Sequence, residues 1–358
     1  MMEVTASAPG KLVLLGEYAV LEGAPALAMG VNRNARVRLA ARSGGECRVS
    51  APDLGLKDVP LRIAAGGVPE WPGSAEQAVK LRLVDQVLRG LVQEGLAPPE
   101  GRGFELHLDS ADFFDTGANP PAKLGLGSSA ALTVALASAF AVFVGRGAAI
   151  ANRRVWLERL LHLHREFQGG HGSGVDVAAS LIGGLITYRL EEHGTQPRFQ
   201  AANWPAEVHP LFIWSGRSAS TANFLDRLAQ WKSGHGGEYA AHMRALTEIA
   251  ERASAAAAAG QGRGFIEGAS AYAAALKEFG AACGLEIFSP EHERLTALAT
   301  EAGVAYKPCG AGGGDFGVVF ALEPARLAEV QKRITGAGFR CVPLAVDEHG
   351  LVLEYKGF

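Results

Sequence analysis

The chain has 358 residues, and its 34 Lys and Arg against 37 Asp and Glu leave a formal charge of −3 at neutral pH. Hydrophobic residues make up 48% and charged residues 20% of the sequence, which excludes a disordered chain and a polyelectrolyte. The near-neutral balance gives no bulk electrostatic reason to expect nucleic acid or an anionic membrane as a partner. Any anionic ligand must therefore be held by local groups.

The cysteines and the N-terminus indicate a cytoplasmic protein. Four cysteines lie far apart without a CxxC pair, so we expect free thiols in a reducing compartment. The first residues lack the basic-then-apolar order of a secretory signal. The uncharged stretch 125–145 approaches the length of a membrane span, but its Ala, Ser and Gly content favours a buried helix.

In chain order, the first fifty residues are typical of strands and turns, with a Pro-Gly turn expected just before Lys11. The spacing of the apolar residues Val79, Leu83, Val87 and Leu91 predicts one amphipathic helix over about 75–94. A strand at 103–110, a long apolar helix from about Ser128, a helix over about 154–168 and a strand at 185–190 complete the first half.

The polar stretch 191–200 is expected to connect two domains, 1–195 and 196–358. The second half is predicted to contain strands at 210–216, 317–322, 340–346 and 351–355 and helices near 221–231, 238–259, 264–282, 290–302 and 325–334. Strands and helices mix in both halves, which predicts an α+β fold.

Two glycine-rich segments are candidate ligand loops. Gly125 and Gly127, with two serines, precede a strong helix, so backbone N–H groups converge at the positive end of its dipole and can bind phosphate. Ordinary capping by Ser128 or Ser129 is the alternative. Five of the eight residues 310–317 are glycine, which favours a loop that closes over a ligand, with a flexible linker as the alternative. The two loops together suggest one ligand at a domain interface.

Two charged residues are candidates for catalysis. Lys11 has the chemistry to polarise a phosphate or a hydroxyl, although a surface lysine at the start of a strand is the alternative. Asp176 follows a glycine-rich turn and enters a small apolar helix, so it is either a favourable helix N-terminal charge or a positioned acid or base.

Taken in order, the segments 8–23 (APGKLVLLGEYAVLEG), 124–132 (LGLGSSAAL) and 307–317 (KPCGAGGGDFG) resemble the three motifs of the GHMP kinase superfamily. The resemblance spans residues 8–322 and is strongest to the phosphomevalonate kinases, with the mevalonate kinases as the competing branch. It implies a two-domain α+β fold, with an ATP-binding N-terminal domain similar to domain 2 of ribosomal protein S5 and a ferredoxin-like C-terminal domain. Cys309 and Phe316 depart from the pattern, in which a serine and a small residue or cysteine are common.

The resemblance also implies a site. Lys11 would neutralise charge between donor and acceptor, and Asp176 would orient or deprotonate the acceptor. The ATP phosphates would lie on Gly125, Leu126, Gly127, Ser128, Ser129 and Ala130, with Mg²⁺ held by Ser128. The acceptor, phosphomevalonate or mevalonate in isoprenoid precursor synthesis, would contact Glu17, Ser173, Gly174, Arg217, Ser220, Thr221, Gly312 and Gly313.

Several alternatives stay open. A different acceptor, such as homoserine or a sugar, would keep the fold, and an inactive ligand-binding protein is disfavoured by the presence of Lys11 and Asp176. Glu166 lies near where related kinases place a metal-binding acid, but it is left outside the expected metal site. The residues His162, His164 and His171 form no metal-ligand pattern, and we expect each on a helix surface or in solvent. Both a monomer and a homodimer are compatible with the sequence.

Overall fold

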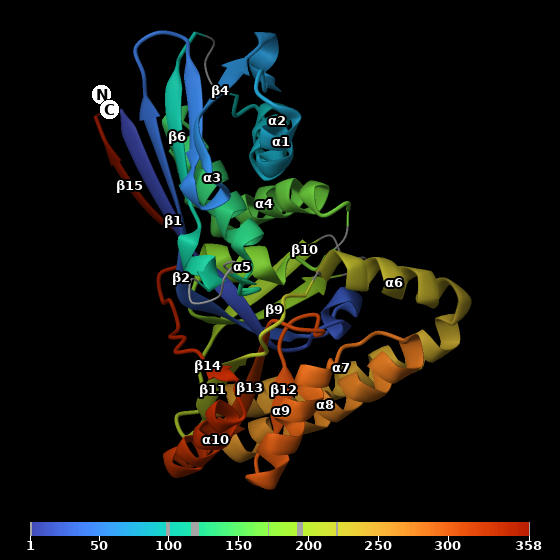
Figure 1. Ribbon diagram of the computed structural model, residues 1–358. Coiled ribbons are helices and arrows are strands. Elements are labelled where there is room, and N and C mark those ends of the chain that lie inside the picture. The colour runs from blue at the N-terminus through green and yellow to red at the C-terminus, as the bar shows by residue number, and fades with distance from the viewer. Residues whose placement is uncertain are drawn as a thin grey trace.

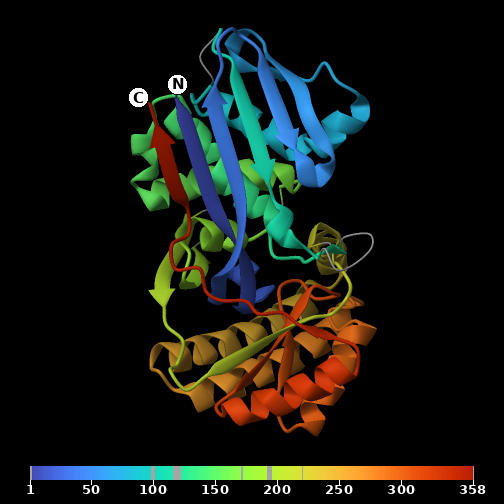
Figure 2. The ribbon, with the colours of Figure 1, turned by 60° about the vertical axis from the view of Figure 1, so that its left-hand side comes forward.

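The computed structural model describes residues 2–97, 101–115, 122–170, 172–191, 196–219 and 221–357. Two β-sheets lie one above the other, each covered by helices, and the two chain termini lie side by side on the larger sheet (Figure 1, Figure 2). The expected α+β class is therefore confirmed.

The larger sheet is built around a long antiparallel pair, β1 with β2. Its strands are β1 (Glu3–Leu15), β2 (Ala26–Ala41), β3 (Cys47–Ala51), β4 (Leu56–Ile63), β5 (Pro69–Glu70), β6 (Phe104–Asp109), β9 (Leu185–Glu191), β10 (Gln196–Ala202) and β15 (Val352–Lys356). They run in the order β10-β9-β2-β6-β3-β4-β5, and β1 pairs with both β2 and β15. A separate short hairpin joins β7 (Phe114–Asp115) to β8 (Ala122–Lys123).

The expected Pro-Gly turn before Lys11 is wrong. Pro9 and Gly10 lie inside β1, where the register against β2 shifts between them as in a β-bulge. The bulge serves a close approach, because a Cβ at Gly10 would lie 2.7 Å from both the Leu126 carbonyl oxygen and the Phe113 ring. Glycine therefore lets β1 touch the loop that precedes the long apolar helix.

That helix is α3 (Ser128–Phe143), and nearly all of its residues are buried against β1, β2 and α5 (Val175–Ile182). The stretch is thus a buried helix, as its composition predicts. Across the described ranges of the chain, no helix has both the length and the apolar character needed to cross a membrane. The helix α4 (Arg153–Phe167) packs beside α3 and is anchored there by a 3.0 Å hydrogen bond from the Trp156 indole to the Ser138 hydroxyl.

The single helix expected over 75–94 is wrong, because the chain forms α1 (Ala75–Lys80) and α2 (Arg82–Gln93) with a break at Leu81. Val87 and Leu91 are buried on α2, but Val79 is 74% exposed on α1. The apolar face of the sequence pattern is therefore divided between two helices.

The smaller sheet contains β11 (His209–Trp214), β12 (Tyr306–Pro308), β13 (Phe316–Ala321) and β14 (Arg340–Cys341), in the antiparallel order β12-β13-β11-β14. The helices α6 (Thr221–Gly234), α7 (Gly236–Ala258), α8 (Gly262–Cys283) and α9 (Pro290–Glu301) lie between β11 and β12 in the chain, and α10 (Pro324–Gly336) lies between β13 and β14. Helical connections in these two places, with this strand order, are the ferredoxin-like arrangement that the resemblance implies.

The chain passes between the two sheets twice. Residues 196–200, expected as a connection, instead begin β10, which pairs with β9, while residues 192–195 lie outside the described residues. The strand expected over 340–346 ends at Cys341, because the chain then turns back to β2, where the Asn32 N–H donates to the Ala345 carbonyl. The chain ends on the larger sheet as β15, and the division into 1–195 and 196–358 stays a prediction.

Candidate active site

The loop that leads into α3 is shaped for an anion. Gly125 and Gly127 have φ angles of 75° and 78°, in the left-handed region that glycine adopts without strain. Gly127 is the N-cap of α3 and, among the described residues, no side chain caps this end, so capping by Ser128 or Ser129 does not explain the serines. The first N–H groups of α3 are therefore left for a ligand, as in other phosphate-binding helix ends.

Lys11 is tied to this loop by backbone and side chain. Its N–H donates to the Leu126 carbonyl at 2.8 Å. Its aliphatic chain lies so close to Gly127 that a Cβ there would be 3.0 Å from the lysine Cγ and Cε. Lys11 thus lies beside the loop, in the wall of a cavity that Gly125, Gly127 and Ser128 also line.

Asp176 lies in the first turn of α5, where it accepts a 2.9 Å hydrogen bond from the Val177 N–H. His164 of α4 stands behind it: its Nδ1 is 3.9 Å from Asp176 Oδ2, and its Nε2 is 3.3 Å from the Ser129 hydroxyl. The expectation that His164 lies on the helix surface is therefore wrong. Leu157, Leu161 and His164 recur at helical spacing, and that pattern is the sequence signal for a buried histidine.

The other residues considered on α4 face away from this contact. His162 pairs with Glu166 at 3.6 Å on the exposed side of the helix. Glu166 is not among the residues that line the cavity beside the loop, and its place outside the metal site stays a prediction. His171 lies outside the described residues.

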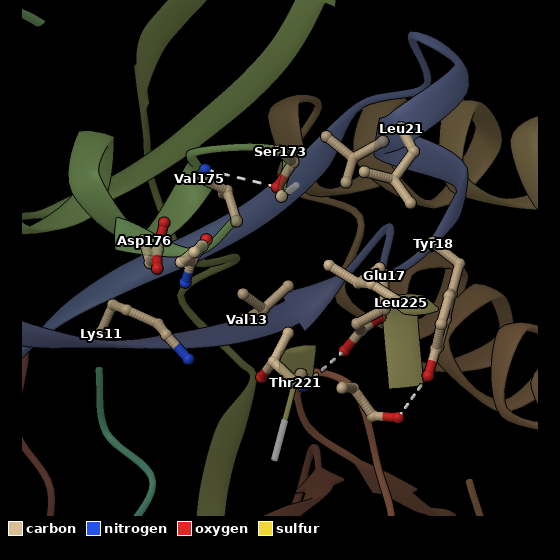
Figure 3. Close-up of a pocket in the computed structure, with 15 residues that line it drawn as sticks. Lys11, Val13, Glu17, Tyr18, Leu21, Ser173, Val175, Asp176, Thr221 and Leu225 are labelled. Carbon is tan, nitrogen blue, oxygen red and sulfur yellow. Dashed lines mark hydrogen bonds between the residues drawn. The ribbon is translucent and has the colours of Figure 1, made fainter. Parts of the chain in front are cut away.

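A second cavity adjoins the first, and both are lined by Lys11, Gln168, Asp176 and Thr221. Figure 3 shows Lys11 and Asp176 at one end of this second cavity and Glu17 and Tyr18 at the other. Its wall is partly apolar, with Val13, Val20, Leu21 and Leu225. A half suited to phosphate and a half suited to a small organic molecule thus meet at Lys11 and Asp176.

Glu17 is expected to contact the acceptor, and its side chain forms an ion pair with Lys307 of β12. Burial raises the pKa of the Glu17 carboxyl, while the positive charge of Lys307 opposes that rise. Glu17 still lines the second cavity. Contact with an acceptor stays a prediction.

The remaining residues expected to bind the acceptor are spread over different places. Ser173 and Thr221 line the second cavity, and the Ser173 carbonyl accepts a 2.7 Å hydrogen bond from Tyr188. Gly174 faces the core, since a Cβ there would collide with Leu161. Gly312 and Gly313 pack against hydrophobic side chains, those of Ile287 and Phe224.

Arg217 and Ser220 belong to the segment between β11 and α6. The Arg217 guanidinium lies 3.3 Å from Glu286 and 3.8 Å from Glu291, so acidic side chains outside the cavities hold it in this structure. Ser220 lies outside the described residues. Their part in acceptor binding stays a prediction.

Asp315 is a site residue that the sequence reasoning missed, because the motif around it was treated as glycine loop alone. It has a φ of 58°, and its carboxylate lies against Gly125, where a Cβ would collide with it. The Ala219 N–H donates to Oδ1 at 3.1 Å. Burial raises the pKa of Asp315 to about 6, although that hydrogen bond and the charges of Lys11 and Lys123 oppose the rise.

The turn that carries Asp315 is held by a buried histidine. His292 Nε2 lies 2.8 Å from the Gly314 carbonyl, and its Nδ1 lies 2.7 Å from the Tyr306 hydroxyl. A carbonyl can only accept, so Nε2 carries the proton and the tyrosine donates to Nδ1. Burial lowers the pKa of His292 to about 4, which keeps the ring neutral.

The Mg²⁺ ion expected at Ser128 requires oxygen ligands. The Ser128 hydroxyl and the carboxylates of Asp176 and Asp315 line one cavity, and the hydroxyl is not used as a helix cap. Oxygens of this kind would hold a Mg²⁺ ion, which would supply positive charge beside the phosphates. In the described part of the chain, no group of three or more His, Cys, Asp and Glu residues forms a complete metal cage by itself.

Comparisons with known proteins identify relatives of this chain. Residues 82–184 match the family model of the GHMP kinases N terminal domain. A phosphomevalonate kinase of Streptomyces sp. (strain CL190) is 30% identical over 383 residues, covering 96% of this chain and 97% of that protein. A mevalonate kinase of Thermococcus gammatolerans is 26% identical, covering 99% of both chains.

The fold is also shared with a solved structure, that of Streptococcus pneumoniae phosphomevalonate kinase in complex with phosphomevalonate and AMPPNP. The TM-score is 0.75 at 18% identity, covering 96% of this chain and 99% of that chain. A glycine loop at a helix N-terminus, beside a lysine and a carboxylate, is suited to phosphoryl transfer to a small molecule. The chain belongs to the GHMP kinase family of ATP-dependent phosphotransferases.

Proposed function

We propose that this kinase transfers the γ-phosphoryl group of ATP to the phosphate of phosphomevalonate, with diphosphomevalonate and ADP as the products. The observation that carries the proposal is the cationic lining of the phosphate-side cavity, where Lys11, Arg82 and Lys123 lie around the loop of Gly125 and Gly127. These three cations and the N–H groups of the helix N-terminus can neutralise phosphate charge in this cavity, which the carboxylates of Asp176 and Asp315 also line. The relative of 30% identity, a phosphomevalonate kinase, supports the same acceptor.

Phosphoryl transfer to the phosphate of phosphomevalonate requires little help from a general base. A phosphate monoester has a second pKa of about 6, so its oxygen is largely ionised at neutral pH and attacks the γ-phosphorus without first losing a proton. The P–O bond to ADP breaks as the new P–O bond forms, and charge on the transferred group is stabilised by Lys11 and by the N–H groups of the loop. Asp176 then orients the acceptor and Lys11. Mg²⁺, for which Ser128 and Asp176 are suitable ligands, would supply further charge neutralisation.

Mevalonate is the second candidate acceptor, because a specific contact favours it. Asp176 lies beside His164, which in turn contacts Ser129, and a carboxylate supported in this way is suited to take the proton of an alcohol. The relative of 26% identity is a mevalonate kinase. With this acceptor Asp176 would act as a true base.

A direct assay separates the candidates. Purified protein is incubated with ATP, Mg²⁺ and one acceptor at a time, and ADP formation is measured with phosphomevalonate, mevalonate and homoserine. We expect turnover with phosphomevalonate and at most a small fraction of it with the other two. Turnover with mevalonate alone would overturn the acceptor assignment. If no ADP forms with any of the three acceptors, a ligand-binding protein without activity is favoured.

A further inference from the structure

A buried ion pair joins the two sheets at one end of the second cavity, hereafter the acceptor cavity. This is the end away from Lys11 and Asp176. Glu17, just after β1, is 4% exposed, and Lys307, on β12, is 2% exposed. The removal of two charges from water costs several kcal/mol per ion, and a pair of apolar side chains would often serve stability as well. A role beyond stability is therefore worth seeking.

The hydrogen bonds of this pair are unequally shared between the two carboxylate oxygens. Lys307 Nζ donates to Glu17 Oε1 and, at 2.7 Å, to the Pro308 carbonyl. The Gly310 N–H donates to the same Oε1 at 3.3 Å. Among the described residues no donor reaches Oε2, although this oxygen is fully buried. Burial of a carboxylate oxygen without a hydrogen bond costs free energy, which indicates that a molecule outside the chain supplies the donor to Oε2.

The surrounding contacts leave Glu17 little freedom. The Tyr272 hydroxyl of α8 donates to the Glu17 carbonyl at 2.6 Å. The next residue, Tyr18, has a φ of 61° and donates from its hydroxyl to the Ala311 carbonyl at 2.6 Å. A non-glycine residue keeps such a conformation only where its surroundings impose it, and such places cluster at functional sites.

Glu17 lines the acceptor cavity together with Ser173, Leu225 and Ala311. Figure 3 shows its side chain among those that face this cavity, at the end away from Lys11 and Asp176. A group of the acceptor that does not react is expected at this end. Phosphomevalonate carries such a group, a tertiary hydroxyl remote from its phosphate.

We propose that Lys307 is a positioning residue for the acceptor: it holds Glu17 Oε1, so that Oε2 accepts a hydrogen bond from the unreacting hydroxyl. The proposal rests on the proposed function for the identity of the acceptor. Mevalonate carries the same hydroxyl, so the assignment of the contact does not depend on which of the two acids reacts. A site built in this way rejects an analogue that lacks the hydroxyl, because Oε2 would then stay unpaired.

The test combines a change in the protein with a change in the substrate. Wild type and Lys307→Met are assayed with phosphomevalonate and with its 3-deoxy analogue, and the KM for ATP is measured in parallel. In the wild type we expect kcat/KM for the deoxy analogue to be about 10- to 100-fold lower, as for loss of a hydrogen bond to a charged group. In Lys307→Met we expect the KM for phosphomevalonate to rise about tenfold or more and the KM for ATP to stay unchanged. The ratio of kcat/KM between phosphomevalonate and its deoxy analogue should fall to a few-fold.

Two matched variants separate positioning from simple structural support. Lys307→Arg keeps the charge and should recover part of the discrimination. Lys332→Met removes an exposed lysine of α10 and should change none of the constants. If Lys307→Met folds and keeps both the normal KM and the normal discrimination, the proposal is overturned and the ion pair is only structural.

Should Lys307→Met not fold, the wild-type comparison alone decides, since equal kcat/KM for the two substrates excludes a hydrogen bond to the hydroxyl. The acceptor assay reports separately on the proposed function. If mevalonate alone reacts, the role of Lys307 is tested in the same way, with mevalonate and its deoxy analogue as the two substrates. If neither acid reacts, both proposals fail.

Discussion

The two halves of the site are built in different ways. The phosphate side is a contiguous loop, residues 124–130, whose ligand groups are backbone N–H groups and whose shape depends on Gly125 and Gly127. The acceptor side is made of side chains, and Glu17 and Lys307, 290 residues apart in the chain, are buried against each other there. Under the proposed function, donor binding would therefore be a local property of one loop, whereas acceptor binding would depend on how the two sheets dock.

Asp315 connects these two regions. It lies on the loop before β13, yet its carboxylate touches Gly125 and accepts from the Ala219 N–H. Lys11 belongs to both cavities as well. Substitutions in the phosphate loop should thus act mainly on nucleotide binding, while substitutions around Glu17 should change acceptor binding and stability together.

The largest effect is expected where the two regions meet. Lys11→Met and Asp176→Asn should each lower kcat about 1,000-fold, because each removes charge or orientation needed at the transferring group. Nucleotide affinity should stay within a few-fold, since the loop that holds the phosphates is untouched. Steady-state kinetics together with calorimetric titration of a non-hydrolysable nucleotide measures both. Near-normal turnover in either variant would remove that residue from the mechanism.

A glycine substitution tests whether the phosphate loop acts locally. Gly125→Ala combines a φ of 75° with a collision against Asp315, whereas Gly145→Ala combines a φ of 77° with open space around the added Cβ. Both should lose about 1–2 kcal/mol of stability from left-handed strain, and Gly125→Ala should lose more, because the added Cβ must displace the Asp315 carboxylate. Gly125→Ala alone should also weaken nucleotide binding, by about 100-fold.

Chemical denaturation and nucleotide titration of the two glycine variants give the comparison. Equal nucleotide affinity in both would contradict the assignment of the loop. A much larger stability loss in Gly125→Ala would mean that the loop and Asp315 fold as one unit.

A smaller, pH-dependent effect is expected at Asp315, whose pKa burial raises from 3.8 to about 6. A carboxyl with a raised pKa in the folded state stabilises the fold when protonated; this contribution is full below about pH 4 and is lost as the pH rises through 6. Asp315→Asn resembles the protonated form and can still accept from Ala219. The variant should therefore be about 1–2 kcal/mol more stable than wild type at pH 8, with the difference vanishing near pH 4.

Urea denaturation of wild type and Asp315→Asn at several pH values measures this difference. A constant difference across the range would show that Asp315 does not titrate between pH 4 and 8. Reduced stability of the variant at pH 8 would instead show that the negative charge between Lys11 and Lys123 stabilises the empty site.

The site residues that the sequence predicts depend on local backbone geometry, whereas those that it does not predict depend on contacts between distant segments. Gly125, Gly127 and Ser128 were located from the sequence because positive φ angles and a helix N-terminus are properties of adjacent residues. His164 and Asp315 were missed because their importance lies in what they touch. The break at Leu81 was missed because the apolar spacing runs through it without interruption.

The sequence by itself determined the α+β class, the phosphate loop, the order of the three motifs and the family that they indicate. Those features are repeated patterns or short backbone motifs, and their physics is local. The tertiary structure decided the partner of Glu17, the burial of His164, the contact of Asp315 with Gly125 and the return of the chain to β15. Each of these joins residues far apart in the chain, and such pairings arise only when the two sheets and their helices pack.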